Sequence, residues 1–215
     1  MTGGRTGTTS TVGDAGVSLF WLPLGAGGRS VRWNGRIYEA LMAGREHRPA
    51  RPIYHSALEV VTTHGTFVIE MAPVWSGPTA DRGVVREGPV GAHFLGRFQA
   101  FRYEVRCWHD GAIPDLAEAV QSPQLVSSDA SRADAVLDVV RTVPALTWGR
   151  DELGAGEMWN SNSVVAWLLA CTGHDMNAIQ PPEGGRAPGW GAGLILAARR
   201  TDSAHAYQLS AISTR

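Results

Sequence analysis

The stretch over residues 157–173, EMWNSNSVVAWLLACTG, constrains the fold more than any other part of the chain. It begins with short polar side chains, whose oxygen atoms can accept hydrogen bonds from the free N–H groups of a first helical turn. An almost unbroken apolar run follows over residues 164–169. A helix that is apolar on nearly all sides has to be buried. The sequence therefore predicts a core helix that begins near Asn160 and ends near Gly173, because glycine commonly terminates helices.

The length and charge of the chain indicate one folded domain without a strongly charged surface. A chain of 215 residues is long enough for one sizeable core. Its formal net charge of −1 gives no electrostatic reason to expect binding to nucleic acid or to an anionic membrane. No apolar run reaches the roughly 18–20 residues that span a bilayer, so we expect no membrane span. We predict a disordered tail over residues 1–16, rich in Gly, Thr and Ser, and a single domain over residues 17–215.

Cysteine and histidine usage predicts neither a disulfide framework nor a metal site. Cys107 and Cys171 are the two cysteines, and no Cys-x-x-Cys motif is present. The seven histidines include no His-x-x-x-His pair, which is a common spacing for metal ligands. The first residues contain no apolar stretch of the kind that a secretory signal needs. We therefore expect a cytoplasmic protein without a metal or another cofactor.

Residues 54–73 carry the clearest β pattern in the chain. Two β-rich runs, YHSALEVVT and TFVIEMAP, are joined through Thr-His-Gly, which is typical of a hairpin. If the loop comprises residues 62–65, Val61 pairs with Thr66, and His55 and Glu70 lie on the same face of the hairpin. Their diagonal separation is then about 7–8 Å, within reach of two long side chains. A different loop length would shift this register.

Strand composition recurs in four further places. Residues 17–24 and 98–108 are rich in β-branched and aromatic side chains. A strand-like piece over residues 31–43 runs into a short helix, and a closing strand is predicted from Leu194 onward. The sheet is therefore expected to draw strands from both ends of the chain.

Helical patterns and loops separate these strands. Residues 113–119 and 133–141 have helical patterns, the second with Asp129 as a candidate cap. Residues 75–91 and 181–193 are rich in Gly and Pro and are expected to be long loops. This order of elements predicts an α+β fold.

Three side chains from distant parts of the chain have the chemistry of a catalytic triad. A nucleophile needs a base within hydrogen-bond reach, and a third group usually holds the base. Ser161 at the helix start would be the nucleophile, His55 the base, and Glu70 the group that orients the imidazole. The same helix start is typical of a well-capped core helix, so both interpretations stay open. The residues expected to position an oxyanion are Asn160, Asn162 and Ser163.

The string WNSNSVVAWLL resembles the nucleophile helix of the circularly permuted papain-like, NlpC-type superfamily, which includes lecithin:retinol acyltransferase-like and PPPDE-like branches. In those families an Asn, a Cys and a polar residue precede an apolar run, and Ser161 stands at the position of the Cys. The order also matches, since His55 opens a strand, a polar residue lies on the next strand and the helix comes late in the chain. The resemblance implies a permuted papain-like core with a small antiparallel sheet packed against a buried nucleophile helix. It also implies acyl transfer through a covalent intermediate without a cofactor.

Ser161 departs from the pattern of that superfamily. A cysteine at a helix start beside a histidine can rest as a thiolate, because the helix dipole and the imidazolium lower its pKa. A serine has to lose its proton during the attack itself. Three explanations compete: a natural Ser–His–acid enzyme, a protein that lost catalysis and kept a binding site, and an engineered Cys→Ser change.

Two functions from different classes follow. The first is a hydrolase or acyltransferase that acts on an amide, thioester or ester bond of a small-molecule or peptide substrate. The second is a non-catalytic binding module, in which the helix start holds a carboxylate or a peptide end. A separation of more than about 5 Å between the Ser161 hydroxyl and the His55 ring would favour binding. The sequence leaves the oligomeric state open.

Overall fold

The computed structural model describes residues 14–24, 51–74 and 82–213. This part of the chain is an α+β fold with a six-stranded antiparallel sheet in the order β4-β5-β3-β2-β1-β6. The strands are β1 Gly16–Pro23, β2 Tyr54–Thr62, β3 Gly65–Pro73, β4 Val84–Pro89, β5 Arg102–His109 and β6 Gln124–Ser127.

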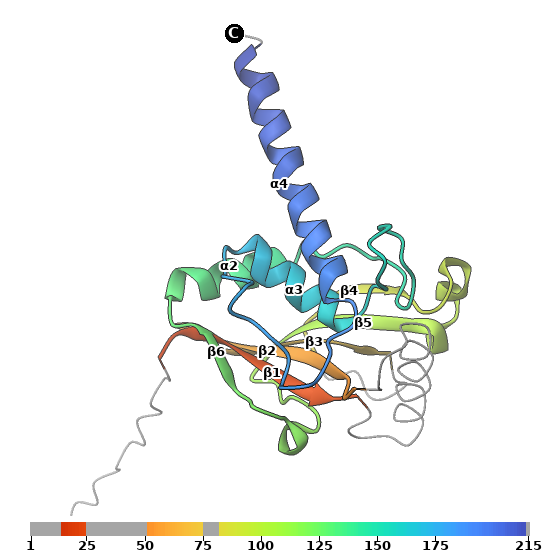
Figure 1. Ribbon diagram of the computed structural model, residues 1–215, viewed down its shortest axis with the longest axis vertical. Helices are drawn as coiled ribbons and strands as arrows, with labels where there is room; N and C mark the ends of the chain where they lie inside the picture. Colours follow the sequence, from red (N-terminus) through yellow and green to blue (C-terminus); the bar gives the residue numbers. More distant parts are fainter. Residues whose placement is uncertain (1–13, 25–50, 75–81, 214–215) are drawn as a thin grey trace, which may run out of the picture.

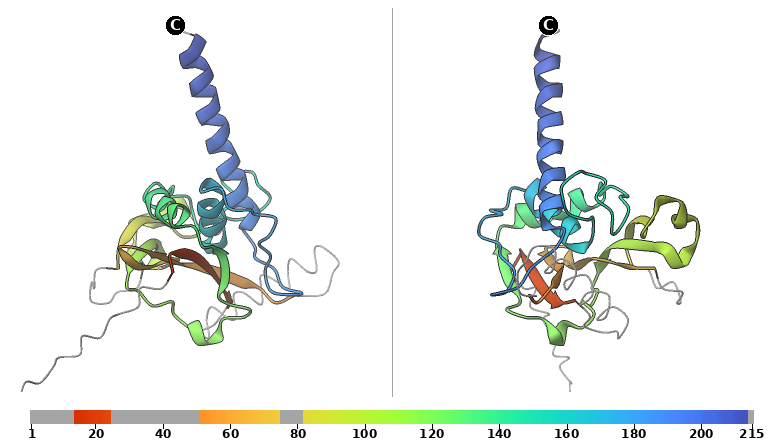
Figure 2. Two further views of the ribbon diagram at one scale, coloured as in Figure 1. Left: turned by 90° about the vertical axis from the view of Figure 1, so that its left-hand side faces the viewer. Right: turned by 45° about the vertical axis from the view of Figure 1, so that its right-hand side comes forward.

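Helices α2 and α3 pack over one face of the sheet, and α4 runs from that layer away from the body (Figures 1 and 2). Short 3₁₀ turns occupy the connections on either side of β5. The described α-helices are α2 Ala130–Val140, α3 Ser161–Cys171 and α4 Trp190–Ser213, and the 3₁₀ turns are η1 His93–Arg97, η2 Gln99–Phe101 and η3 Leu116–Glu118.

The β2–β3 hairpin forms in the predicted register. Val61 pairs with Thr66, and the pairing continues to Leu58 opposite Ile69. Because successive side chains of a strand point to opposite faces, this register determines which residues meet the helices. Leu58 belongs to the main core with α3, whereas its neighbour Ala57 belongs to a separate cluster.

The two faces of the sheet are therefore different environments. We call the face covered by α2 and α3 the helix face and the opposite one the far face. The helix face carries the main core, which also takes in most of α3. The smaller apolar cluster of the far face comprises Phe20, Leu22, Ala57, Val68 and Ile113.

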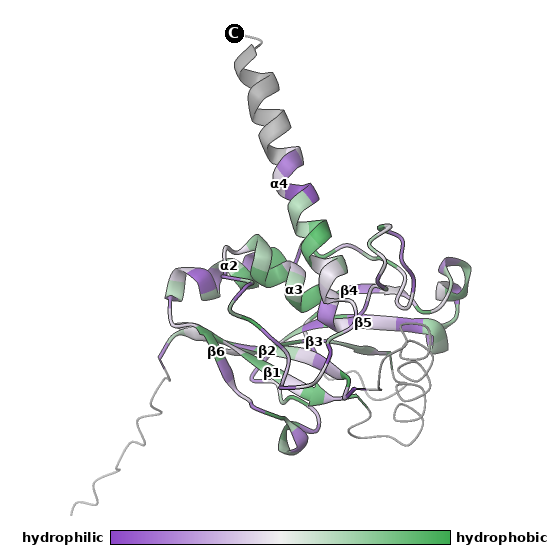
Figure 3. Ribbon diagram, in the orientation of Figure 1, coloured by the Kyte–Doolittle hydropathy of each residue, from purple (hydrophilic) through white to green (hydrophobic). Residues whose placement is uncertain are grey.

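Helix α3 is buried along nearly its whole length, as its apolar sequence predicts. Its residues 161–169 are all buried, and Figure 3 shows hydrophobic colouring along it. It packs closely against the start of α4, where a Cβ on Gly193 would lie 2.2 Å from the carbonyl oxygen of Ser163. A residue larger than glycine at position 193 would force these two helices apart.

Several predicted elements differ from the structure. The closing strand from Leu194 is wrong, because this residue lies inside α4. Short apolar runs fit a helix and a strand equally well, and the Leu, Ala and Arg residues that follow are strong helix formers. The helix over residues 113–119 shrinks to the single turn η3, and the predicted loop over residues 75–91 contains β4.

Other predictions are confirmed or lie outside the described residues. The strand over residues 17–24 is β1, and the helix after Asp129 is α2, capped by the Asp129 carboxylate on the N–H of Ser131 at 2.8 Å. The piece over residues 31–43 lies outside the described part of the chain. So does the predicted tail, except for its last residues, which lead into β1.

Candidate functional site

The start of α3 is fixed by a reciprocal cap. The side chain of Asn160 accepts hydrogen bonds from the N–H groups of Asn162 at 2.9 Å and Ser163 at 3.3 Å. The Ser163 hydroxyl in return accepts from the N–H of Asn160 at 3.1 Å. This capping box satisfies N–H groups that a helix start otherwise leaves free. The helix begins where the sequence predicts.

Asn162 ties α3 to β2. Its side-chain oxygen accepts from the hydroxyl of Ser56 at 2.9 Å, and its side-chain nitrogen donates to the carbonyl of Tyr54 at 2.9 Å. The same nitrogen donates to Pro188, also at 2.9 Å. Asn162 is 2% exposed, so each of these bonds replaces a contact with water.

Ser163 ties α3 to the segment before α4. Its hydroxyl donates to the carbonyl of Gly189 at 2.7 Å, and Gly189 has the positive φ of 87° that favours glycine. We call this whole arrangement the cap cluster, which comprises the side chains of Ser56, Asn160, Asn162 and Ser163 with the carbonyls of Tyr54, Pro188 and Gly189. The predicted positioning residues thus serve as connectors between β2, α3 and α4.

Ser161 is the exception within this polar group. It is the first residue of α3 and only 6% exposed. Its hydroxyl has no hydrogen-bond partner among the described residues, although the side chains on both sides of it are fully engaged. The fully buried side-chain atoms without a partner in the described residues are Arg82 Nε, Trp159 Nε1 and His174 Nε2, so the Ser161 hydroxyl still reaches solvent and is open to a ligand.

His55 lies on the other face of the sheet from Ser161. Its neighbours Tyr54 and Ser56 face α3, so alternation along β2 directs His55 to the far face, beside its β1 partner Leu22. No hydrogen bond joins His55 to Ser161 in the described part of the chain. Burial lowers the pKa of His55 to about 4, and the nearby carboxylate of Asp115 only partly opposes this. The imidazole is therefore neutral near pH 7.

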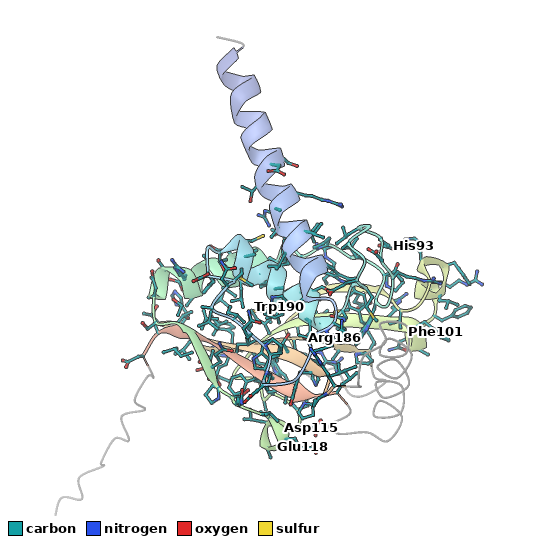
Figure 4. All side chains as sticks on the ribbon, viewed as in Figure 1. His93, Phe101, Asp115, Glu118, Arg186 and Trp190 are labelled. Atoms are coloured by element: carbon teal, nitrogen blue, oxygen red, sulfur yellow. The ribbon has the colours of Figure 1, made fainter. Side chains whose placement is uncertain are left out.

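Figure 4 shows the separation through two labelled residues. Asp115, which influences the pKa of His55, lies below the sheet, whereas Trp190 at the start of α4 lies on the helix side. Trp190 contacts Trp21 of the main core, with ring centroids 5.3 Å apart. The structure therefore does not assemble the predicted Ser161–His55 pair.

Glu70 shares the far face with His55, as the predicted register requires, but it binds another residue. The Glu70 carboxylate accepts from Arg106 at 2.8 Å, and Arg106 also donates to Glu104 at 2.8 Å. Arg82 completes this far-face charge network with a 3.0 Å contact to Glu104. Burial raises the pKa of Glu70, and Arg106 opposes the rise. The carboxylate is thus engaged by a guanidinium and does not orient the imidazole.

Arg106 and Asp115 are the participants that sequence reasoning missed. Glu104 and Arg106 are two residues apart on β5, which signals that they share a face. Placing Arg106 directly opposite Glu70 needs the β3–β5 register, which no local turn determines. Asp115 sits in a left-handed conformation before η3, and only the tertiary structure brings it near His55.

The cysteines offer no alternative nucleophile in thiolate form. Burial raises the pKa of both Cys107 and Cys171, so each remains a thiol near pH 7. Among the described residues, no three His, Cys, Asp or Glu side chains are placed to hold a metal ion. Within the same ranges, no helix combines the length and the apolar character that crossing a membrane requires.

Comparisons of the chain with models of protein families, with curated proteins and with solved structures found no match.

Proposed function

We propose that this chain is a non-catalytic binding module that holds a carboxylate, such as the end of a peptide, at the start of α3. The observation that carries the proposal is the hydroxyl of Ser161. It is the first side chain of a buried helix, it is 6% exposed, and it has no partner among the described residues. A carboxylate oxygen would supply the missing acceptor.

The electrostatics around Ser161 favour an anion. The N-terminus of a helix carries a partial positive charge, and α3 has no acidic side chain in its first turn to balance it. The neighbouring start of α4 shows the same preference, because the carboxylate of Glu157 accepts from the N–H of Gly191 at 2.9 Å. A ligand carboxylate at Ser161 would do for α3 what Glu157 does for α4.

Binding of a carboxylate requires fewer correctly placed groups than catalysis does. A serine nucleophile requires a base in hydrogen-bond contact, and His55 lies across the sheet. Strand pairing with Leu22 on one side and the burial of the far face hold His55 there. A bound carboxylate requires only hydrogen-bond donors, which the hydroxyl of Ser161 supplies.

A Ser–His–acid hydrolase or acyltransferase on a permuted papain-like core is the second candidate. It is favoured by the free hydroxyl of Ser161, which stands where the resemblance places the nucleophile. The order of a hairpin followed much later by a buried helix is compatible with that core. This candidate needs a base other than His55 in its present position, or a rearrangement of the start of β2.

Two measurements on the full chain distinguish these functions. Peptides with a free C-terminal carboxylate should shift the amide resonances of α3's first turn, whereas the same peptides with an amidated end should not. Ser161→Ala should reduce the shifts at least tenfold at equal peptide concentration. Loss of any difference between free and amidated peptides would overturn the binding proposal.

A fluorophosphonate probe tests the catalytic alternative. We expect no covalent labelling of the wild type, because no base among the described residues forms a hydrogen bond with Ser161. Labelling that disappears in Ser161→Ala would establish the hydrolase instead. His55→Gln is the matched control, since it should leave carboxylate binding unchanged if His55 stays on the far face.

A further inference from the structure

The connection between β4 and β5 carries an exposed aromatic surface. Phe94 is 65% exposed, Phe98 49% and Phe101 43%. Half of the large hydrophobic side chains that are exposed in the described part of the chain lie in this connection. We call residues 93–101, which form η1 and η2, the aromatic tip. So dense a group of exposed aromatic rings marks an interaction surface.

The aromatic tip is a projection and not a groove. It stands out from the sheet at the β4–β5 end in Figure 1, and Figure 2 shows the same projection from another side. Figure 4 labels His93 and Phe101 at this end of the molecule, away from η3. A convex apolar surface suits a partner that can accept an inserted tip, and a flat lipid layer is such a partner.

The charge around the rings is basic. Residues 90–102, VGAHFLGRFQAFR, contain two arginines and one histidine but no acidic residue. The guanidinium of Arg97 lies 4.8 Å from the ring centroid of Phe98, and no carboxylate pairs with it among the described residues. Arg102 is partly balanced by Glu87 at 3.2 Å. The aromatic tip is therefore a local basic region in a chain whose net charge is −1.

We propose that the aromatic tip docks onto a membrane surface that carries anionic headgroups. Phe94, Phe98 and Phe101 would enter the boundary between headgroups and acyl chains, where aromatic rings are favoured. Arg97 would meet the lipid phosphates while its guanidinium stays over the ring of Phe98. This inference is independent of the proposed carboxylate site at α3.

The test is sedimentation of the full chain with sucrose-loaded vesicles. One set contains phosphatidylcholine alone, and the other contains phosphatidylcholine and phosphatidylserine at roughly three to one. We expect binding to the anionic vesicles, weakened by added salt. The double variant Phe94→Ser with Phe98→Ser should lower the partition coefficient at least about tenfold, because two inserted rings are lost. Arg97→Gln should lower it about fivefold and reduce its dependence on salt.

Leu125→Ser is the matched control, because Leu125 is 67% exposed on β6 and lies outside the aromatic tip. It should bind vesicles like the wild type, and unchanged circular dichroism should show that all variants are folded. Failure of the wild type to bind either vesicle would overturn the proposal. So would an equal loss in Leu125→Ser. A third outcome would also overturn the membrane proposal. In it, the wild type forms a concentration-dependent dimer and does not bind vesicles, whereas the double phenylalanine variant is a monomer. The aromatic tip would then be a protein interface.

Discussion

The two faces of the sheet bury polar groups in opposite ways. On the helix face, the cap cluster consists of amides and hydroxyls that satisfy one another over 2.7–3.3 Å. On the far face, the charge network buries Glu70, Glu104 and Arg106, with Arg82 beside them. Neutral groups lose little when they exchange water for each other, whereas ions lose much of their hydration and need a close partner.

This difference between the two faces indicates which of them can accept a ligand. Every ionic group of the far-face charge network has a counter-charge within 3.0 Å. Next to the cap cluster, the hydroxyl of Ser161 reaches solvent and has no partner in the described ranges. The far face is therefore expected to govern stability and pH dependence, and the helix face to govern binding.

The largest effect is expected from Arg106→Met. It leaves the buried carboxylate of Glu70 without a counter-charge, while Glu104 keeps only Arg82, which costs about 3–5 kcal/mol of unfolding free energy. Urea unfolding measures this loss. The control is Glu87→Gln, because the Arg102–Glu87 pair is exposed and should contribute only about 0–1 kcal/mol. Equal losses in both variants would contradict the distinction between buried and exposed pairs.

Asn162→Ala should have the next largest effect. It breaks the bonds to Ser56, Tyr54 and Pro188 together, and unsatisfied buried groups remain, so we expect a loss of about 2–3 kcal/mol by urea unfolding. Asn177→Ala on an exposed turn serves as control and should change stability by less than about 0.5 kcal/mol. A small loss at Asn162 would mean that the cap cluster does not hold the layers together.

His55 should make the protein less stable in mild acid. Its pKa is about 4 in the folded state against 6.5 as the ordinary value, so the folded state resists protonation. Its contribution is present above pH 6.5 and is lost as the pH falls from 6.5 toward 4. The His55 side chain keeps some contact with water, which weakens the effect of burial, so we expect a loss of stability of about 1–2 kcal/mol.

Urea unfolding of the wild type and His55→Gln at pH 7.5 and 4.5 measures this loss. The wild type should lose stability relative to the variant as the pH falls. Glu70 has the opposite effect on stability as the pH falls, because its raised pKa favours the protonated form in the folded state. Since both proteins contain Glu70, its contribution cancels in the comparison. A constant difference in unfolding free energy between the two proteins across this pH range would contradict the prediction, because it would mean that folding does not shift the pKa of His55.

The smallest effect is expected from Ser161→Ala. Its hydroxyl has no hydrogen-bond partner to lose among the described residues, so unfolding free energy should change by less than about 0.5 kcal/mol. Ser163→Ala removes the bond to Gly189 and half of the capping box, and should cost about 1–2 kcal/mol. A cost at Ser161 equal to that at Ser163 would indicate a structural hydrogen bond and weaken the case for a ligand there.

The sequence by itself determined the features that depend on near neighbours. The start of α3 follows from Asn160 and Ser163, which are three residues apart and cap each other. The β2–β3 register follows from a tight turn between two alternating strands, and it correctly puts His55 and Glu70 on one face. These contacts involve short separations along the chain, so local chemistry suffices to specify them.

Only the tertiary structure decided which face of the hairpin α3 would cover. Alternation tells that Ser56 and His55 point in opposite directions, but it does not tell which of them meets a helix more than a hundred residues later. That choice depends on the packing of the whole core against β1, β2 and α4. The β3–β5 register, which places Arg106 opposite Glu70, also depends on long-range packing, because no local turn joins these two strands.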